Sequence, residues 1–248
     1  MKKVFLMLTL LIFGLTSCAG NKETKDSKKL RVGLNAVFAP FEYKENGQVV
    51  GFDVDLINEI AKDLNYETEI IDQSFDGLIP SLKAGKIDVI VSGMTATEDR
   101  KKSVDFTDDY FVSKQLYIRK KGNNSVTAST LKGKKIGVLL GSIQEIAARK
   151  IDGAVVVPNK SIVNTILDLK MGKVDALIMD NVVAIEYMKK NPEMEIFDEK
   201  ADKEGMAMAF DKGKNPELIQ KVNAELKKLK ENGKYDELLK KYNLNLSK

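Results

Sequence analysis

The sequence predicts an α/β protein made of two hinge-linked lobes, each with a central, mostly parallel sheet. Two observations lead to this prediction. The order strand, helix, strand, helix, strand occurs twice along the chain, and this alternation is typical of parallel sheets with right-handed crossovers. The chain has 248 residues, of which 43% are hydrophobic and 31% charged, and this suits two globular lobes of about 100 residues each.

The first alternation starts at residue 30. Apolar residues at helical spacing between Val54 and Leu64 predict a helix, and Gly85 ends a second, shorter one. In chain order we expect a strand at 30–34, a loop containing Pro40, a helix at 53–64, a strand at 67–71, a helix at 76–84 and a strand at 87–91.

The alternation starts again after the lysine-rich segment 119–122. Ser161 is a typical N-cap residue, and Gly172 follows the end of the helix that Ser161 begins. In chain order we expect a strand at 135–139, a helix at 143–151, a strand at 154–157, a helix at 161–169 and a strand at 174–179.

The C-terminal part has helices but no third alternation. After a strand at 205–210, Asn215 caps a long amphipathic helix that begins at Pro216, and a last helix spans 235–242. Because helices without their own sheet must pack on an existing lobe, we place them on the first lobe. The expected lobe 1 comprises 30–113 and 209–248, and the expected lobe 2 comprises 114–208, with hinge strands near 114–119 and 205–210.

The N-terminal segment is typical of bacterial export. Two lysines precede an apolar run at 4–15, which is too short to span a bilayer. The run ends in LTSC, which resembles the lipobox of bacterial lipoproteins, with Cys18 as its last residue. This resemblance implies a signal peptide at 1–17, acylation of Cys18 and a polar tether over 18–29. An ordinary signal peptide with an incidental cysteine is the alternative.

Charge and composition exclude several classes of function. The formal charge of +4 comes from residues 1–29, so the part expected to fold has no net charge and no clustered basic face for nucleic acid. The chain has no histidine and one cysteine, which excludes Ser-His-Asp and Cys-His catalysis, histidine-ligated zinc and an internal disulfide. We therefore expect no metal and no cofactor.

Polar and aromatic residues follow the carboxyl ends of the expected strands, where open parallel sheets bind ligands. Arg100 belongs to the first lobe, while Asp180 and the helix that starts at residue 143 belong to the second. A cation, a carboxylate and free backbone N–H groups together complement a zwitterion. The residues at these strand ends are Asn35, Phe38, Ser92, Gly93, Met94, Thr95, Arg100, Leu140, Gly141, Ser142, Ile143, Gln144 and Asp180.

Each of these residues also has an ordinary structural interpretation. Arg100 lies in a run of charged residues and could be on a solvated helix surface. Asp180 could cap the helix that follows it, and Thr95 could be another cap. Phe38 and Phe75 could be core residues. Only their coincidence at strand ends favours a binding site.

Five segments carry a resemblance to a known family. They are APFE at 39–42, GFDVDL at 51–56, FDGLIPSL at 75–82, SGMT at 92–95 followed by Arg100, and DFTDDYF at 105–111. Over residues 30–245 the sequence resembles the polar amino-acid family of bacterial solute-binding proteins, family 3. The resemblance implies the type II periplasmic-binding-protein fold, in which two lobes close about a hinge around a ligand.

The resemblance also implies how the ligand is held. Arg100 would pair with its α-carboxylate, helped by the backbone amides of Thr95 and Ile143. Asp180, the Thr95 hydroxyl and the Gly93 carbonyl would take its α-ammonium group.

The same resemblance assigns the side-chain pocket. Phe38 and Phe75 match positions that sandwich the ligand side chain. Ile143 stands where relatives often have Thr, so only its backbone can serve, and Asn35 stands where relatives often have Asp or Glu. An amide favours a polar neutral side chain such as that of glutamine, although cationic ligands remain open. The further pocket residues implied are Asn35, Met94, Leu139 and Gln144.

The function that follows is that of the substrate-binding component of an ABC transporter. We expect an exported, lipid-anchored monomer that captures a glutamine-like or basic amino acid and delivers it to a permease with its ATPase, touching the membrane only through the anchor. Two alternatives are a sensor component that presents its ligand to a membrane receptor, and a dehydratase-type enzyme on the same fold. The enzyme would need a general acid or base, for which Asp180 is the one strong candidate.

Overall fold

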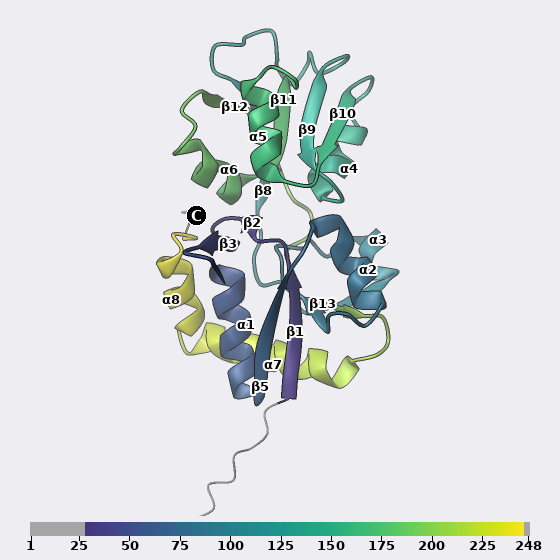
Figure 1. Ribbon diagram of the computed structural model, residues 1–248, viewed down its shortest axis with the longest axis vertical. Helices are drawn as coiled ribbons and strands as arrows, with labels where there is room; N and C mark the ends of the chain where they lie inside the picture. Colours follow the sequence, from purple (N-terminus) through teal and green to yellow (C-terminus); the bar gives the residue numbers. More distant parts are fainter. Residues whose placement is uncertain (1–27, 246–248) are drawn as a thin grey trace, which may run out of the picture.

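A computed structural model describes residues 28–245 of the chain, which form two lobes, each with a five-stranded sheet (Figure 1). We call the lobe with the N-terminal strand lobe 1 and the other lobe 2. The expected signal peptide and Cys18 lie outside the described residues. Within 28–245 no helix is long and apolar enough to cross a membrane.

The lobe 1 sheet has the strand order β5-β1-β6-β13-β7. Strand β1 pairs in parallel with β5 and β6, while β13 is antiparallel to both of its neighbours. The sheet is therefore completed by a strand from the C-terminal third of the chain. The bounds are β1 Lys28–Leu34, β5 Tyr66–Asp72, β6 Val89–Ile90, β7 Val104–Phe106 and β13 Ala209–Asp211.

The helices of lobe 1 cover this sheet. In helix α1 one face is apolar and buried, as the helical spacing predicted. The two C-terminal helices pack beside α1 (Figure 1), and their buried residues are Val222, Leu226 and Leu229 of α7 and Tyr235 and Leu238 of α8. The bounds are α1 Phe52–Asp63, η1 Phe75–Gly77, α2 Leu78–Lys83, α3 Glu98–Lys101, α7 Pro216–Glu231 and α8 Lys234–Lys241.

A small three-stranded sheet stands on lobe 1 where the sequence predicted only a loop around Pro40. It consists of β2 Val37–Phe38, β3 Glu42–Glu45 and β4 Gln48–Val50. Strands of two to four residues are too short to show a period-2 pattern. The Asn46-Gly47 pair between β3 and β4 could have predicted this hairpin. Both residues have positive φ values, which are typical of a tight hairpin turn.

The lobe 2 sheet has the order β10-β9-β11-β8-β12. Strands β10, β9 and β11 are parallel, whereas β8 is antiparallel to β11 and to β12. The edge strand β12 was not predicted. The bounds are β8 Lys114–Lys120, β9 Lys135–Leu139, β10 Val155–Asn159, β11 Ala176–Asp180, β12 Met194–Ala201, α4 Ile143–Arg149, α5 Ile162–Lys170 and α6 Asn181–Met188.

The chain crosses between the lobes twice, at 107–113 and at 202–208. The expected hinge strand at 114–119 is β8, which is hydrogen-bonded on both sides within the lobe 2 sheet. Of the strand expected at 205–210, only the last part is β13; Met206 makes isolated bridges to Thr95 and Phe111. The two crossings are thus the segments that join the sheets of the two lobes.

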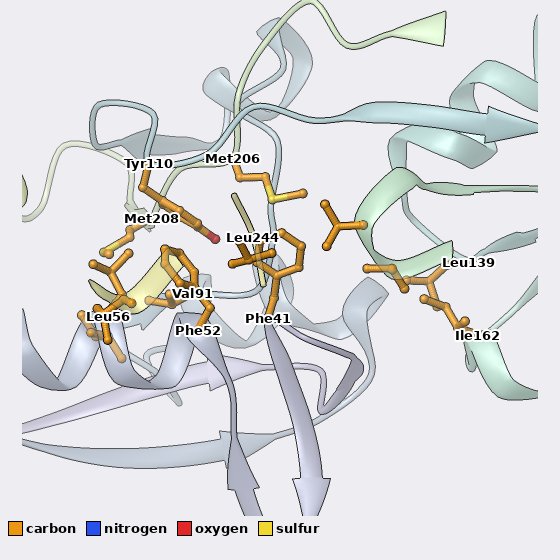
Figure 2. Packing of buried hydrophobic residues seen from close by; sticks show 14 of the residues in the cluster. Phe41, Phe52, Leu56, Val91, Tyr110, Leu139, Ile162, Met206, Met208 and Leu244 are labelled. Carbon is orange, nitrogen blue, oxygen red and sulfur yellow. The ribbon is translucent and has the colours of Figure 1, made fainter. Parts of the chain in front are cut away.

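The main hydrophobic core extends from lobe 1 to the edge of lobe 2. Phe52 packs edge-on against Phe41 and Tyr235, with ring centroids 6.1 and 5.7 Å apart. Figure 2 shows Phe41 and Phe52 of this group beside Met206, with Leu139 and Ile162 of lobe 2 beyond them. The two lobes thus share apolar contact at the base of the space between them.

Candidate functional site

A small pocket lies between the lobes and is walled by residues from both. Nine of the eleven ligand-binding residues expected from the sequence line it, and two further wall residues, Ser142 and Met206, were not among them. The wall consists of Phe38, Phe75, Gly93, Thr95, Arg100, Leu139, Ser142, Ile143, Gln144, Asp180 and Met206.

Arg100 is half-buried at this wall and bonds to both lobes. Its Nη1 donates to the Thr95 carbonyl at 2.8 Å, and its Nη2 donates to the Gly141 carbonyl at 2.9 Å. The guanidinium carbon lies 5.4 Å from the centre of the Phe75 ring. Burial lowers the pKa of Arg100 to about 10, so the side chain stays charged at neutral pH. Arg100 is therefore a cation at the pocket, and the solvated-surface interpretation does not describe it.

Asp180 ends strand β11 and is buried at the pocket wall. Its Oδ1 accepts from the backbone N–H groups of Val182 and Val183 at 2.9 and 3.3 Å, so it caps helix α6. Its Oδ2 accepts from Ser113 Oγ at 2.5 Å. Burial raises the pKa of Asp180 to about 6. The residue is thus a helix cap and a pocket carboxylate together.

Gly93 lets an aromatic ring lie directly against the backbone. Its φ is +52°, and a Cβ atom built there would be 2.6 Å from the Phe38 ring. Its N–H donates to Asp53 Oδ2 at 2.8 Å and to Tyr110 Oη at 3.2 Å. Phe38 in turn stacks on Phe41 at 5.6 Å between centroids. Phe38 is thereby fixed as one wall of the pocket.

The start of helix α4 forms the facing wall from lobe 2. Ser142 caps this helix, because its Oγ accepts from the Glu145 N–H at 3.2 Å. Gly141 is held by its N–H, which donates to Glu145 Oε2 at 2.7 Å. Ile143 and Gln144 follow at the wall, at helix positions whose N–H groups have no partner within the helix.

Thr95 is at the pocket but is not a helix cap. Thr97 has that role for α3, because its side chain accepts from the Arg100 N–H at 3.3 Å. Thr95 is held by a β-bridge to Met206 on the second crossing. Met206 was missed from the sequence because it belongs to a connecting segment and follows no strand end.

Asn35 and Met94 do not belong to the pocket wall. Asn35 is buried, its Nδ2 donates to the Gln73 carbonyl at 2.9 Å, and its Oδ1 has no partner within the described structure. Met94 packs in the lobe 1 core beside Leu78 and Ile90. Within residues 28–245 no group of three or more acidic or cysteine side chains is placed to hold a metal ion.

Residues 30–245 match the model of the bacterial extracellular solute-binding proteins, family 3. The chain belongs to this family. Among curated members, a probable histidine-binding protein of Campylobacter jejuni is 42% identical, with 98% of this chain and 99% of that protein aligned. The arginine-binding extracellular protein ArtP of Bacillus subtilis is 38% identical, with 98% of each chain aligned.

Solved structures of solute-binding proteins share the fold. An ancestral arginine-binding protein bound to arginine superposes with a TM-score of 0.83 at 44% identity, covering 86% of this chain and 97% of the other. An ancestral arginine-binding protein bound to glutamine gives a TM-score of 0.83 at 45% identity, with the same coverage of both chains. Holo ArgBP from T. maritima gives 0.76 at 41%, covering 86% and 95%. The type II fold expected from the sequence is confirmed.

Proposed function

We propose that this solute-binding protein captures a polar amino acid between its lobes and delivers it to an ABC permease and its ATPase. One observation carries the proposal: Arg100 of lobe 1 and Asp180 of lobe 2 line the same pocket between the lobes. An amino acid is a zwitterion, so both of its backbone charges would find an opposite charge there.

Arg100 has N–H donors that are free to bind a ligand carboxylate. Arg100 uses Nη1 and Nη2 on backbone carbonyls, and a guanidinium has five N–H donors, so others remain for a carboxylate. The N–H groups at the start of α4 would assist from lobe 2. Asp180, the Thr95 hydroxyl and the Gly93 carbonyl surround the position proposed for the ammonium group. The aromatic rings of Phe38 and Phe75 supply apolar walls for the ligand side chain.

The proposed capture mechanism is hinge closure. Outside the two crossings, hydrogen bonds of the described structure link the lobes at two places: Arg100 Nη2 donates to the Gly141 carbonyl, and Tyr187 Oη donates to the Val37 carbonyl at 2.9 Å. Rotation about the crossings at 107–113 and 202–208 would break both bonds and open the pocket. Residues 30–113 with 209–248, and residues 114–208, are the two bodies that we propose to move.

For the ligand, we propose a basic amino acid first and glutamine second. Relatives with 34–42% identity are named for arginine or histidine, and a 45% identical ancestral protein was solved with glutamine. All of these ligands have a polar side-chain end that could reach beyond the aromatic walls.

We further propose that the protein is exported and held at the membrane by lipid on Cys18. The support is the lipobox-like LTSC segment after an apolar run of signal-peptide length. More than one acyl chain would be needed for stable anchoring. We expect the protein to act as a monomer, with no metal or cofactor.

The test is isothermal calorimetry of the processed protein with each of the twenty amino acids, and with Arg100→Ala as the matched variant. We expect arginine, lysine, histidine or glutamine to bind with an affinity that the variant loses. No binding of any amino acid would contradict the proposal, and so would binding that Arg100→Ala leaves unchanged.

A further inference from the structure

Three neighbouring strands of lobe 2 bring a serine and two aspartates to the same edge of their sheet. Strand β8 is antiparallel to both β11 and β12, so the start of β8 lies beside the ends of the other two. Asp180 is the last residue of β11, Ser113 directly precedes β8 and Asp202 directly follows β12. Ser113 and Asp202 thus belong to the two crossings, one to each, while Asp180 lines the pocket.

One hydroxyl group joins the two carboxylates. Ser113 Oγ lies 2.5 Å from Asp180 Oδ2 and 3.0 Å from Asp202 Oδ2. A hydroxyl has a single proton to donate, so it can serve only one of these acceptors at a time, and the shorter contact assigns the proton to Asp180. Other groups hold Asp202 in place: the Gln115 side-chain amide donates to its Oδ1 at 2.7 Å, and its own N–H donates to the Ser113 carbonyl at 3.4 Å.

The two carboxylates accept only from neutral donors in the described structure. Asp180 accepts from Ser113 and from two backbone N–H groups, and Asp202 accepts from Ser113 and Gln115. The charged groups that surround the pair are Arg100 on the pocket wall, the buried Glu42, and Glu98, Asp99, Lys150, Lys200, Lys203 and Glu204 in the groove beside Asp202. The three lysines are exposed and form no ion pair with Asp202 within the described residues. Two carboxylates therefore stand side by side with one shared donor and no paired cation.

The pKa values agree with this geometry. Burial raises the pKa of both aspartates, and that of Asp180 reaches about 6. At Asp180 the hydrogen bond from Ser113 opposes this rise, whereas the negative charge of Asp202 adds to it. The hydroxyl and the second carboxylate thus act on Asp180 in opposite directions, because the first favours its ionised form and the second disfavours it.

A ligand ammonium group at Asp180 would supply the charge that the pair lacks. It has one positive charge and three N–H donors. Asp180 would accept from it directly, and the charge of Asp202, one hydroxyl further away, would add to the attraction. Once the ammonium group donates to Asp180, the Ser113 hydroxyl needs only to rotate about its Cβ–Oγ bond for its proton to reach Asp202. All three side chains lie at one edge of the lobe 2 sheet, so this link does not depend on closure of the lobes.

We infer that Asp202 is a positioning residue for ligand capture: acting through Ser113, it adds a second negative charge to the ammonium site and ties that site to both crossings. The inference rests on the proposed function, which assigns Asp180 to the α-ammonium group, and deepens it. Every α-amino acid has this group, so Asp202 should contribute equally to the binding of neutral and cationic ligands.

The first test follows the titration of Asp180 in the ligand-free protein. Carbon-13 NMR of the aspartate carboxyl carbons gives the midpoints, and the Asp180 signal is the one that Asp180→Asn removes. Asp202→Asn removes the second charge and keeps the shape, so the Asp180 midpoint should move to lower pH by about half a unit. Ser113→Ala removes the donor, so the midpoint should move to higher pH. Glu204→Gln is the matched control, because Glu204 lies on the same crossing and bonds to neither Ser113 nor Asp180 in the described structure.

The second test is calorimetry with glutamine and with arginine at pH 7.5. Asp202→Asn should weaken the binding of both ligands by the same factor, about threefold to tenfold, because one negative charge near the ammonium group is lost. The loss of affinity at acid pH should begin at lower pH in this variant than in the wild type. The glutamine affinities of the two proteins should therefore approach each other at pH 5.

Midpoint shifts in opposite directions in the two variants would support the inference, since a loss of packing has no reason to act in opposite directions. An Asp180 midpoint that stays in place in Asp202→Asn, or that moves to higher pH, would overturn it, and so would an unchanged affinity for glutamine. If the midpoints shift as expected but the wild type binds no amino acid, the role in capture fails together with the proposed function, and only the link among the three side chains stands. Asp202 is partly exposed, so Asp202→Asn should fold, and its midpoint decides the question even if Ser113→Ala does not fold.

Discussion

Arg100 of lobe 1 donates a hydrogen bond of 2.9 Å to the backbone carbonyl of Gly141 in lobe 2. The residue that we propose to bind the ligand carboxylate therefore also fastens the two lobes together. A ligand carboxylate placed between Arg100 and the start of α4 would add contacts to both lobes at the same point. Binding and closure are thus coupled through one side chain.

Replacement of Arg100 by Ala should weaken amino-acid binding by roughly 30-fold to several thousand-fold, because truncating a desolvated Arg–carboxylate pair costs about 2–5 kcal/mol. Thermal unfolding should change little, since Arg100 forms no part of a hydrophobic cluster. Calorimetry measures the affinity. A change of less than about threefold would show that Arg100 does not contact the ligand.

Ligand binding should weaken as the pH falls below about 6. Burial raises the pKa of Asp180 to about 6, and the neutral acid cannot pair with an ammonium group. At pH 5 about one tenth of these carboxyls are ionised, so affinity should be about tenfold lower than at pH 7.5. Glutamine suits this measurement, because its side chain does not titrate between pH 5 and 7.5.

Asp180→Asn provides the control for this pH profile. The variant should bind weakly at every pH and should lose the dependence between pH 5 and 7.5. A pH dependence that persists in the variant would assign the titration to another group. Mass spectrometry of the bound amino acid, unchanged after incubation, would separate a binder from an enzyme.

Gly93→Ala should reduce affinity by about tenfold or more, because its Cβ would lie 2.6 Å from the Phe38 ring that walls the pocket. It should also cost roughly 1–2 kcal/mol of stability, since φ is +52°. Gly85→Ala is the matched control: φ is +66° there, with nothing within 4 Å of the added carbon. Equal affinities of the two variants would show that Phe38 does not contact the ligand.

Asn35→Asp tests the identity of the ligand side chain. A carboxylate at this position should shift the preference toward cationic amino acids by about tenfold or more. The change also removes the donor to the Gln73 carbonyl, so Asn35→Ala is needed to show the effect of that loss alone. Dissociation constants for glutamine, arginine, lysine and histidine provide the readout. An unchanged ranking would show that a charge at residue 35, which is not part of the pocket wall, does not reach the ligand side chain.

Cys18→Ala tests the anchor. The precursor should remain uncleaved by lipoprotein signal peptidase and should incorporate no fatty-acid label. Labelling equal to that of the wild type would contradict the lipobox interpretation.

Much of the fold could be read from the sequence because its helices and inner strands are amphipathic or continuously apolar. The helix predicted at 53–64 is α1 at Phe52–Asp63, and the strand predicted at 135–139 is β9 at the same residues. The hairpin of β3 and β4 and the edge strand β12 were missed. Most of their residues are exposed or only partly buried, so no apolar pattern distinguishes them from loops.

The site was predictable where it follows strand ends. Arg100 and Asp180 reach the same pocket because both sheets direct the carboxyl ends of their parallel strands toward the other lobe. Met94 is different: it also follows a strand, but its side chain packs in the core after the turn at Gly93. The direction in which a side chain points after a positive-φ residue is set by the backbone, so it could not be predicted from the type of the residue.

The place of β13 in the lobe 1 sheet has a consequence for synthesis. This strand lies between β6 and β7, so β7 has no neighbour in its sheet until residue 211 has been made. All five strands of the lobe 2 sheet are complete at residue 201. A nascent chain that has emerged to residue 205 should therefore hold a protease-resistant 114–201 while 28–106 is still digested. On the ribosome, the lobe that begins second would be the first to finish.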